Sequence, residues 1–235
     1  MEASSNQQKS LTTFLHPATT STVSNSPTIS KPTSEPERIS KKRIAIEKVP
    51  GLFLIKDFIT QAEETLLWSE VNKLPWTKFG SRYRMLLGWI HDRDNEGKMT
   101  KIGDLPESFQ FVIDRILEDK IMDNRPEQCV INSYEPGQGI SPHIDRVEDF
   151  GRQVTGLSLG SDVVMEFIGP KGEKVELLVP RRSIYLMEGD ARYKWKHSMP
   201  QRKKDKLENG LMNVRKKRIS LTFREVDVGF RKKHI

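Results

Sequence analysis

The chain has 235 residues, 35% of them hydrophobic, which predicts one folded domain of about 150 to 200 residues plus a tail. Its single cysteine, Cys129, excludes an intrachain disulfide and favours a reducing compartment. Since no apolar run approaches about 18 residues and no hydrophobic signal region follows Met1, we expect a soluble intracellular protein without a membrane span. The net charge is +7, and residues 192–235 carry 15 Lys or Arg against 4 Asp or Glu. This excess favours a polyanionic partner, with a solvated basic face as the alternative.

Residues 1–43 are rich in Ser, Thr and Pro and lack apolar periodicity, so we expect a disordered tail. One apolar island in this tail resembles the clamp-binding box of replication and repair proteins, in which a short helical turn inserts into a groove of the sliding clamp PCNA. The island consists of Gln8, Leu11, Phe14 and Leu15. Leu15 stands where the box has a second aromatic residue, and a chance apolar patch is the alternative. The basic cluster at 41–43 is either a nuclear-import signal or linker charge.

The folded domain is expected to span residues 44–235, beginning with short strands at 44–46 and 51–55. Thr60 and Glu63 form a capping box, which predicts a helix from there to about Leu74. Pro106 suits the first turn of a second helix, in which apolar residues recur at helical spacing up to Leu117. Both apolar stripes indicate packing against a core.

The second half of the chain reads as a series of short strands. They are predicted at 154–159, 163–168, 175–179 and 183–187, around His197, and at 219–226. Glycine-containing breaks at 169–172 and 188–190 predict hairpin turns. Such a meander favours an α+β fold with a jelly-roll core, a double-stranded β-helix, flanked by N-terminal helices.

His143 and Asp145 stand at H-x-D spacing, so on an extended segment their side chains point to the same face and can bind one metal. For this pair alone, a surface histidine near an aspartate is the alternative. Two imidazoles and one carboxylate form the facial triad of non-haem Fe(II), and His197 is a third ligand if its strand returns beside the first. Arg218 and Arg224, six residues apart, also share a face, and a guanidinium there suits a dicarboxylate co-substrate.

The motif N-x-Y-x-P-G-x-x-I-x-x-H-x-D at 132–145, the later His197, and R-I-S-L-T-F-R at 218–224 resemble the AlkB family of Fe(II)/2-oxoglutarate dioxygenases. The resemblance covers about residues 50–226. It implies that Fe(II), 2-oxoglutarate and O2 are the cofactors, and that the metal ligands are His143, Asp145 and His197. It also implies that Arg218 binds the far carboxylate of 2-oxoglutarate with help from Asn132 and Tyr134, and that Arg224 lies near the metal-bound end. Taken singly, each position has a structural alternative. Asn132 suits a turn, Tyr134 suits the core, and Arg218 and Arg224 suit surface charges.

In the family, the region corresponding to residues 76–101 forms a lid over the substrate nucleotide. Here it interleaves basic and aromatic residues, namely Arg82, Tyr83 and Arg84, followed by Trp89. This pattern suits a grip on a phosphate and stacking of a flipped base, with Trp89 as the stacking candidate. A tryptophan buried in the core is the alternative.

The resemblance implies an oxidoreductase that acts on nucleic acid, and oxidative removal of alkyl groups from DNA bases is the first hypothesis. Residues 180–183 and 189–197 resemble members that modify the tRNA wobble uridine, whereas 197–204 is similar to the animal DNA-repair members. Val147 stands where repair members place an acidic residue. The tRNA-modifying members also carry an RNA-binding module and a methyltransferase domain, for which we expect no room in this chain.

Three alternatives to DNA repair remain. They are a tRNA uridine hydroxylase, a hydroxylase or demethylase of basic proteins such as histones, and a non-catalytic clamp-binding module. We expect a monomer in the nucleus, with the cytoplasm as a further compartment.

Overall fold

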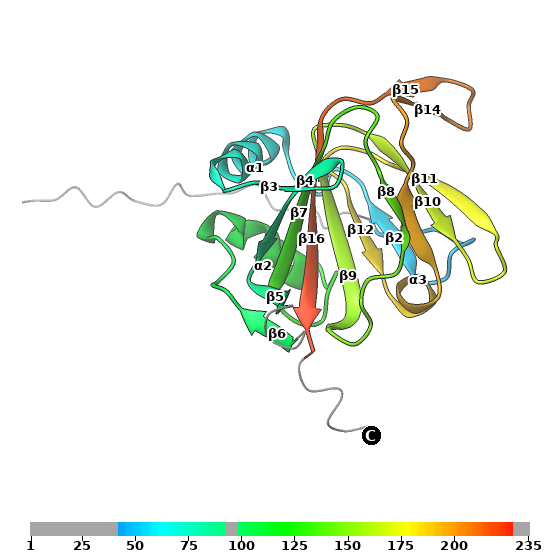
Figure 1. The fold of residues 1–235 in the computed structure, drawn as a ribbon. Helices are drawn as coiled ribbons and strands as arrows, with labels where there is room; N and C mark the ends of the chain where they lie inside the picture. Colours follow the sequence, from blue (N-terminus) through cyan, green and yellow to red (C-terminus); the bar gives the residue numbers. More distant parts are fainter. Residues whose placement is uncertain (1–41, 93–97, 228–235) are drawn as a thin grey trace, which may run out of the picture. The chain divides into compact units, whose positions relative to one another are not determined.

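The computed structural model describes residues 42–92 and 98–227. The predicted clamp-binding box and almost all of the predicted tail therefore lie outside the described residues. The first strand, β1, starts at Ile44, and the sheets are built from there to the end of β16 at Val226 (Figure 1).

Within the described residues, the larger sheet has eight strands in the order β1, β2, β12, β9, β16, β7, β4, β3. All neighbouring pairs in this sheet are antiparallel. The bounds are β1 Ile44–Ala45, β2 Leu52–Ile55, β3 Thr77–Phe79, β4 Arg82–Leu87, β7 Gln128–Tyr134, β9 Phe150–Leu159, β12 Ile184–Met187 and β16 Arg218–Val226.

The smaller sheet lies against one face of the larger one (Figure 1). Its order in the described part of the chain is β11, β10, β13, β8, with bounds β8 Ile140–His143, β10 Val163–Ile168, β11 Lys174–Val179 and β13 Lys196–Met199. Alternate residues of the strands fill the space between the sheets, such as Tyr185 and Met187 of β12 and Phe167 of β10. This arrangement confirms the predicted α+β fold with a jelly-roll core.

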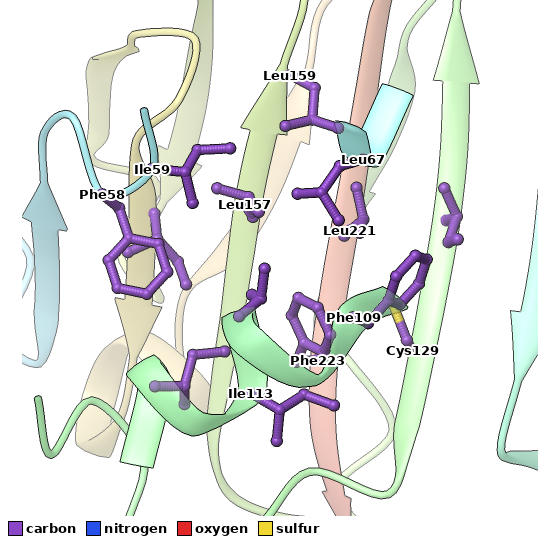
Figure 2. Close-up of a cluster of buried hydrophobic side chains, with 14 of the residues drawn as sticks. Phe58, Ile59, Leu67, Phe109, Ile113, Cys129, Leu157, Leu159, Leu221 and Phe223 are labelled. Carbon is purple, nitrogen blue, oxygen red and sulfur yellow. The ribbon is translucent and has the colours of Figure 1, made fainter. Parts of the chain in front are cut away.

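Helices cover the opposite face of the larger sheet (Figure 1). They are α1 Gln61–Lys73, the 3-10 turn η1 Glu107–Phe109 and α2 Gln110–Glu118. Figure 2 shows how Phe109 and Ile113 from these helical segments meet Leu157, Leu221 and Phe223 from the sheet, all of them 0–1% exposed. Burial of this apolar surface holds the helices to the sheet, and thereby supports the strands that carry the site on the other face.

The capping box that predicts α1 is present. Thr60 Oγ1 accepts a hydrogen bond from the Glu63 amide at 3.2 Å, and Glu63 Oε2 accepts one from the Thr60 amide at 2.7 Å. The predicted helix after Pro106 and the hairpin turn between β10 and β11 are confirmed as well. No helix in 42–92 or 98–227 has the length and apolar character needed to cross a membrane.

The predicted hairpin turn at 188–190 is wrong, because a short helix, α3 Gly189–Tyr193, starts there. Gly189 has φ +52°, a conformation that glycine adopts at little cost. The Ala191 amide then donates to the Pro50 carbonyl at 2.9 Å, which ties the helix to the segment before β2. The sequence pattern also left unassigned the two small hairpins, β5 Trp89–Asp92 with β6 Lys98–Lys101, and β14 Lys204–Lys206 with β15 Met212–Val214.

Candidate active site

Three potential metal ligands meet at the smaller sheet. His143 is the last residue of β8, and the antiparallel partner strand β13 places His197 directly opposite it. Asp145 follows in the loop after β8, so the H-x-D pair straddles a strand end rather than lying within a strand. One ligand atom from each side chain lies within 4.8 Å of the others, and the two imidazole centroids are 4.3 Å apart. The structure therefore brings together the three side chains predicted to hold Fe(II).

The protonation states of two of these ligands suit a metal. Burial lowers the pKa of His197 to about 4, so its imidazole is neutral near pH 7 and can donate a lone pair. Burial alone would raise the pKa of Asp145, but Arg224 and the two histidines lower it to about 2, so the carboxylate is ionised. A neutral imidazole and a carboxylate are the forms that bind Fe(II).

Arg224 on β16 fixes the carboxylate of Asp145. Its Nη2 lies 2.9 Å from one carboxylate oxygen and its Nε lies 3.2 Å from the other. Its Nη1 donates to Gln128 on β7 at 2.8 Å. This two-bonded contact limits the rotation of the carboxylate, so Arg224 acts on the metal site through Asp145.

Arg218 lies at the other end of β16 and is 5% exposed. Its Nε donates to Ser158 Oγ at 2.9 Å, and its guanidinium lies 5.7 Å from the ring centroid of Tyr134, its register partner on β7. In the described part of the chain no carboxylate pairs with it, and burial lowers the pKa of the guanidinium. A buried, unpaired positive charge is unfavourable, and the far carboxylate of 2-oxoglutarate would neutralise it.

The two other predicted 2-oxoglutarate residues lie beside Arg218. Asn132 and Tyr134 are both buried on β7, with Asn132 opposite Ser220 of β16. Burial raises the pKa of the Tyr134 phenol, which keeps it protonated and able to donate a hydrogen bond. All four predicted co-substrate residues thus line one cavity.

That cavity has a volume of about 580 Å³ and reaches from Arg218 past the three metal ligands to its opening. Of the predicted substrate residues, Arg82 and Arg84 line it. Tyr83, the residue between them, points away and is exposed, as the alternation of β4 requires. Trp89 is half-buried and does not line the cavity, so its predicted stacking role has no support from the cavity geometry.

The structure also adds residues that the sequence did not single out. His91 on β5, two residues after Trp89, lines the cavity, and Tyr185 on β12 forms part of the wall. Arg146, next to the ligand Asp145, reaches the cavity and pairs with Asp149. These contacts join separate strands and loops, so no local pattern in the sequence marks them.

Arg192 on α3 is a further residue of the site that the sequence analysis did not single out, and it is 1% exposed. Its guanidinium donates to the carbonyl oxygens of Asp145 at 2.9 Å, Arg146 at 3.0 Å, Gly151 at 3.2 Å and Phe150 at 3.3 Å. One buried side chain therefore bonds to the loop after Asp145 and to the first two residues of β9. Since α3 leads directly into β13, the segment 189–199 supplies both His197 and the guanidinium that bonds to the backbone of Asp145.

The family model of the 2OG-Fe(II) oxygenase superfamily matches residues 51–224, which include every residue of this cavity. The chain belongs to this superfamily.

Within the superfamily, several relatives carry the names of AlkB homologues. Over 185 residues the chain is 32% identical to tRNA (carboxymethyluridine(34)-5-O)-methyltransferase ALKBH8 of Mus musculus, covering 72% of this chain and 27% of that relative. Over 179 residues it is 36% identical to Uncharacterized protein L905 of Acanthamoeba polyphaga mimivirus, covering 75% of this chain and 85% of the relative. The solved structure of OsALKBH1 shares the fold, with a TM-score of 0.58 and 18% identity over 75% of this chain and 98% of that one. The chain is thus an AlkB-family dioxygenase, which sets aside the non-catalytic clamp-binding module.

The residues of this AlkB-family site form two groups, one for the metal and one for the co-substrate. His143, Asp145 and His197 would hold Fe(II), and Arg218 with Asn132 and Tyr134 would hold 2-oxoglutarate. When bound, Fe(II) and 2-oxoglutarate supply the activation of O2 that oxidises a C–H bond of the substrate. The chain's own residues would orient the co-substrate and enclose the reacting carbon within the cavity.

Proposed function

We propose that this AlkB-family dioxygenase acts on nucleic acid and removes alkyl groups oxidatively from DNA bases. The observation that carries the proposal is the composition of the cavity, in which the metal ligands share walls with the guanidinium groups of Arg82, Arg84 and Arg146. Guanidinium groups attract a polyanion and donate hydrogen bonds to base edges, so these walls suit a nucleotide whose base lies toward the metal. The net charge of +11 over residues 192–235 supports the same class of substrate.

In the proposed reaction one atom of O2 enters a C–H bond of the N-alkyl group. The other enters succinate as 2-oxoglutarate loses CO2. For an N-methyl group, the hydroxylated carbon leaves as formaldehyde when its bond to nitrogen breaks, and the nitrogen takes up the proton. Because a stacked base cannot reach the metal, the base must leave the helix or come from a single strand.

The test measures formaldehyde release and 2-oxoglutarate turnover on methylated single-stranded DNA, duplex DNA and tRNA in parallel. Asp145→Ala is the blank, because it removes a metal ligand. Asp123→Ala is the matched control, since Asp123 pairs with Arg152 outside the cavity and should leave turnover intact. Formaldehyde above the blank on DNA supports dealkylation, and its absence on every methylated DNA contradicts it.

A second candidate is hydroxylation of a uridine in tRNA. It is favoured by the identity to ALKBH8 of Mus musculus, whose name states carboxymethyluridine in tRNA as its substrate. The match spans only 27% of that protein, so its activity comes to this chain as a proposal. Turnover of 2-oxoglutarate on tRNA without formaldehyde would support hydroxylation over dealkylation. Turnover on a histone that DNA does not inhibit would instead indicate a protein substrate.

We further propose that the protein is a nuclear monomer that binds the replication clamp through its N-terminal tail. This proposal rests on the likeness of Gln8, Leu11, Phe14 and Leu15 to a clamp-binding box. Capture of the full chain by PCNA, lost in Phe14→Ala and retained in Asp145→Ala, would support it. Equal capture of wild type and Phe14→Ala would contradict it.

A further inference from the structure

The charges that line the cavity are almost all positive. Among the described residues that form its walls there are five arginines, namely Arg82, Arg84, Arg146, Arg218 and Arg224. The one acidic residue in the same set is Asp145, which is a metal ligand and already bonds to Arg224. Addition of Fe(II) and the dianion of 2-oxoglutarate leaves this balance unchanged, because their charges cancel.

Two of the arginines have roles at the metal and the co-substrate, and the other three face the remaining space. Arg82 donates through Nε to Asn132 at 2.9 Å, and Arg84 on the same face of β4 lies 3.6 Å from the ring centroid of Phe79. Arg146 comes from the loop after β8 and pairs with Asp149, which does not line the cavity. Positive charge therefore reaches the substrate space from two separate parts of the fold.

Such walls distinguish bases by charge and by hydrogen-bonding edge. A base methylated at N1 of adenine or N3 of cytosine carries a positive charge at neutral pH and would be repelled by the arginines. Thymine and uracil methylated at N3 are neutral, and their two carbonyl oxygens accept hydrogen bonds from guanidinium donors. The exocyclic amino groups of adenine and cytosine need acceptors instead. In the walls, the carboxylate of Asp145 and the amide oxygens of Gln128 and Asn132 already accept hydrogen bonds from Arg224 and Arg82.

We propose that the cavity selects neutral bases of the thymine and uracil class and disfavours bases with a fixed positive charge, with Arg82, Arg84 and Arg146 as the selecting residues. This inference rests on the proposed action on nucleic acid and names its substrate class. It is compatible with both dealkylation and uridine hydroxylation.

The test compares two single-stranded DNA oligonucleotides of one sequence that differ only in carrying 3-methylthymine or 3-methylcytosine. The two bases present the same N-methyl group and differ in charge and in one edge group. We expect kcat/KM for formaldehyde release to be at least about tenfold higher on 3-methylthymine, the discrimination that one like charge at close range produces. Equal rates, or faster release from 3-methylcytosine, would overturn the inference.

A binding measurement separates this inference from the proposed function. Affinity for the two oligonucleotides is measured with Co(II)-loaded protein and 2-oxoglutarate, without O2. If neither oligonucleotide is demethylated but 3-methylthymine binds more tightly, dealkylation fails and the charge selection stands. If neither base is preferred in binding or in turnover, the charge selection fails.

A matched pair of variants assigns the effect to the cavity. Arg146→Gln removes one positive charge and leaves the Asp149 carboxylate without its guanidinium, so the ratio of 3-methylthymine to 3-methylcytosine turnover should fall about tenfold. Arg152→Gln is the control, because it breaks a similar pair with Asp123 outside the cavity. The ratio cancels any general loss of active protein. An unchanged ratio in Arg146→Gln would remove this residue from the selecting set, and a change of the same size in Arg152→Gln would refute a local effect.

Discussion

Substitution of the buried Arg192 by methionine tests whether one guanidinium holds the metal ligand Asp145 in place. Methionine keeps an unbranched apolar stem but donates no hydrogen bond. Four carbonyl oxygens, including those of Asp145 at 2.9 Å and Arg146 at 3.0 Å, therefore lose a donor. The change lies at the point where α3 meets the loop after Asp145, and it leaves all three metal ligands intact.

The expected size follows from these contacts. A buried polar group left without its partner costs about 1–3 kcal/mol, so the two shorter bonds alone amount to about 2–6 kcal/mol. Burial lowers the pKa of Arg192, which shows that placing its charge inside the protein is unfavourable, and removal of the charge offsets part of the loss. We expect the free energy of unfolding of the metal-free protein to fall by about 3 kcal/mol. Because partners that orient a metal ligand change affinity by about 10–100-fold, we expect Co(II) to bind Arg192→Met weaker by that factor.

Urea unfolding measures the stability, and titration with Co(II) followed by visible absorption measures the metal affinity. Arg115→Met is the matched control, since Arg115 on α2 donates to the Phe58 carbonyl at 3.0 Å on the helix-covered face of the sheet. It should lose stability and keep its Co(II) affinity. If Arg192→Met loses stability but binds Co(II) as tightly as wild type, the guanidinium serves the fold alone and the reasoning is refuted.

Three further changes probe the rest of the site. Arg218→Gln should raise the 2-oxoglutarate concentration for half-maximal turnover by at least about 100-fold, because it removes the two-bonded charge pair with the co-substrate carboxylate. Calorimetry should find the Co(II) affinity unchanged, and weakened Co(II) binding would contradict the separate roles of Arg218 and the metal ligands. Because burial lowers the pKa of His197 to about 4 from 6.5, the unfolded chain takes up a proton that the folded metal-free protein refuses. Its stability should thus fall by up to about 3 kcal/mol as the pH drops from 6.5 to 4, and urea unfolding across this range should show a shallower slope for His197→Gln; equal slopes would exclude His197 as the cause. Gly156→Ala places a Cβ 2.4 Å from the ring of Tyr185 on the cavity wall. We therefore expect the free energy of unfolding to fall by about 1–3 kcal/mol and 2-oxoglutarate to bind more weakly. An unchanged melting temperature would show that the ring moves freely.

Features that depend on near neighbours in the chain could be predicted from the sequence. The capping box of Thr60 and Glu63 sets the start of α1, and the strand predicted at 163–168 has the bounds of β10, Val163–Ile168. The six-residue spacing of Arg218 and Arg224 places both on one side of β16, and the H-x-D spacing keeps Asp145 close to His143 although Asp145 lies just beyond the strand. Short-range geometry fixes these relations, so the residue pattern carries them.

The tertiary structure decided which of these local features meet. Arg192 bonds to carbonyls 41 to 47 residues earlier, and Arg224 joins residues 79 and 96 positions before it, across strands whose register no local pattern specifies. The same holds for β5, where His91 lines the cavity and Trp89 does not. Side-chain periodicity is a property of a single strand or helix, whereas the partner of a buried charge depends on how the two sheets pack. The residue pattern and its resemblance to the AlkB family therefore predicted the candidate metal ligands and co-substrate residues, whereas the packing of the sheets determined how these side chains are held and which charges surround the cavity.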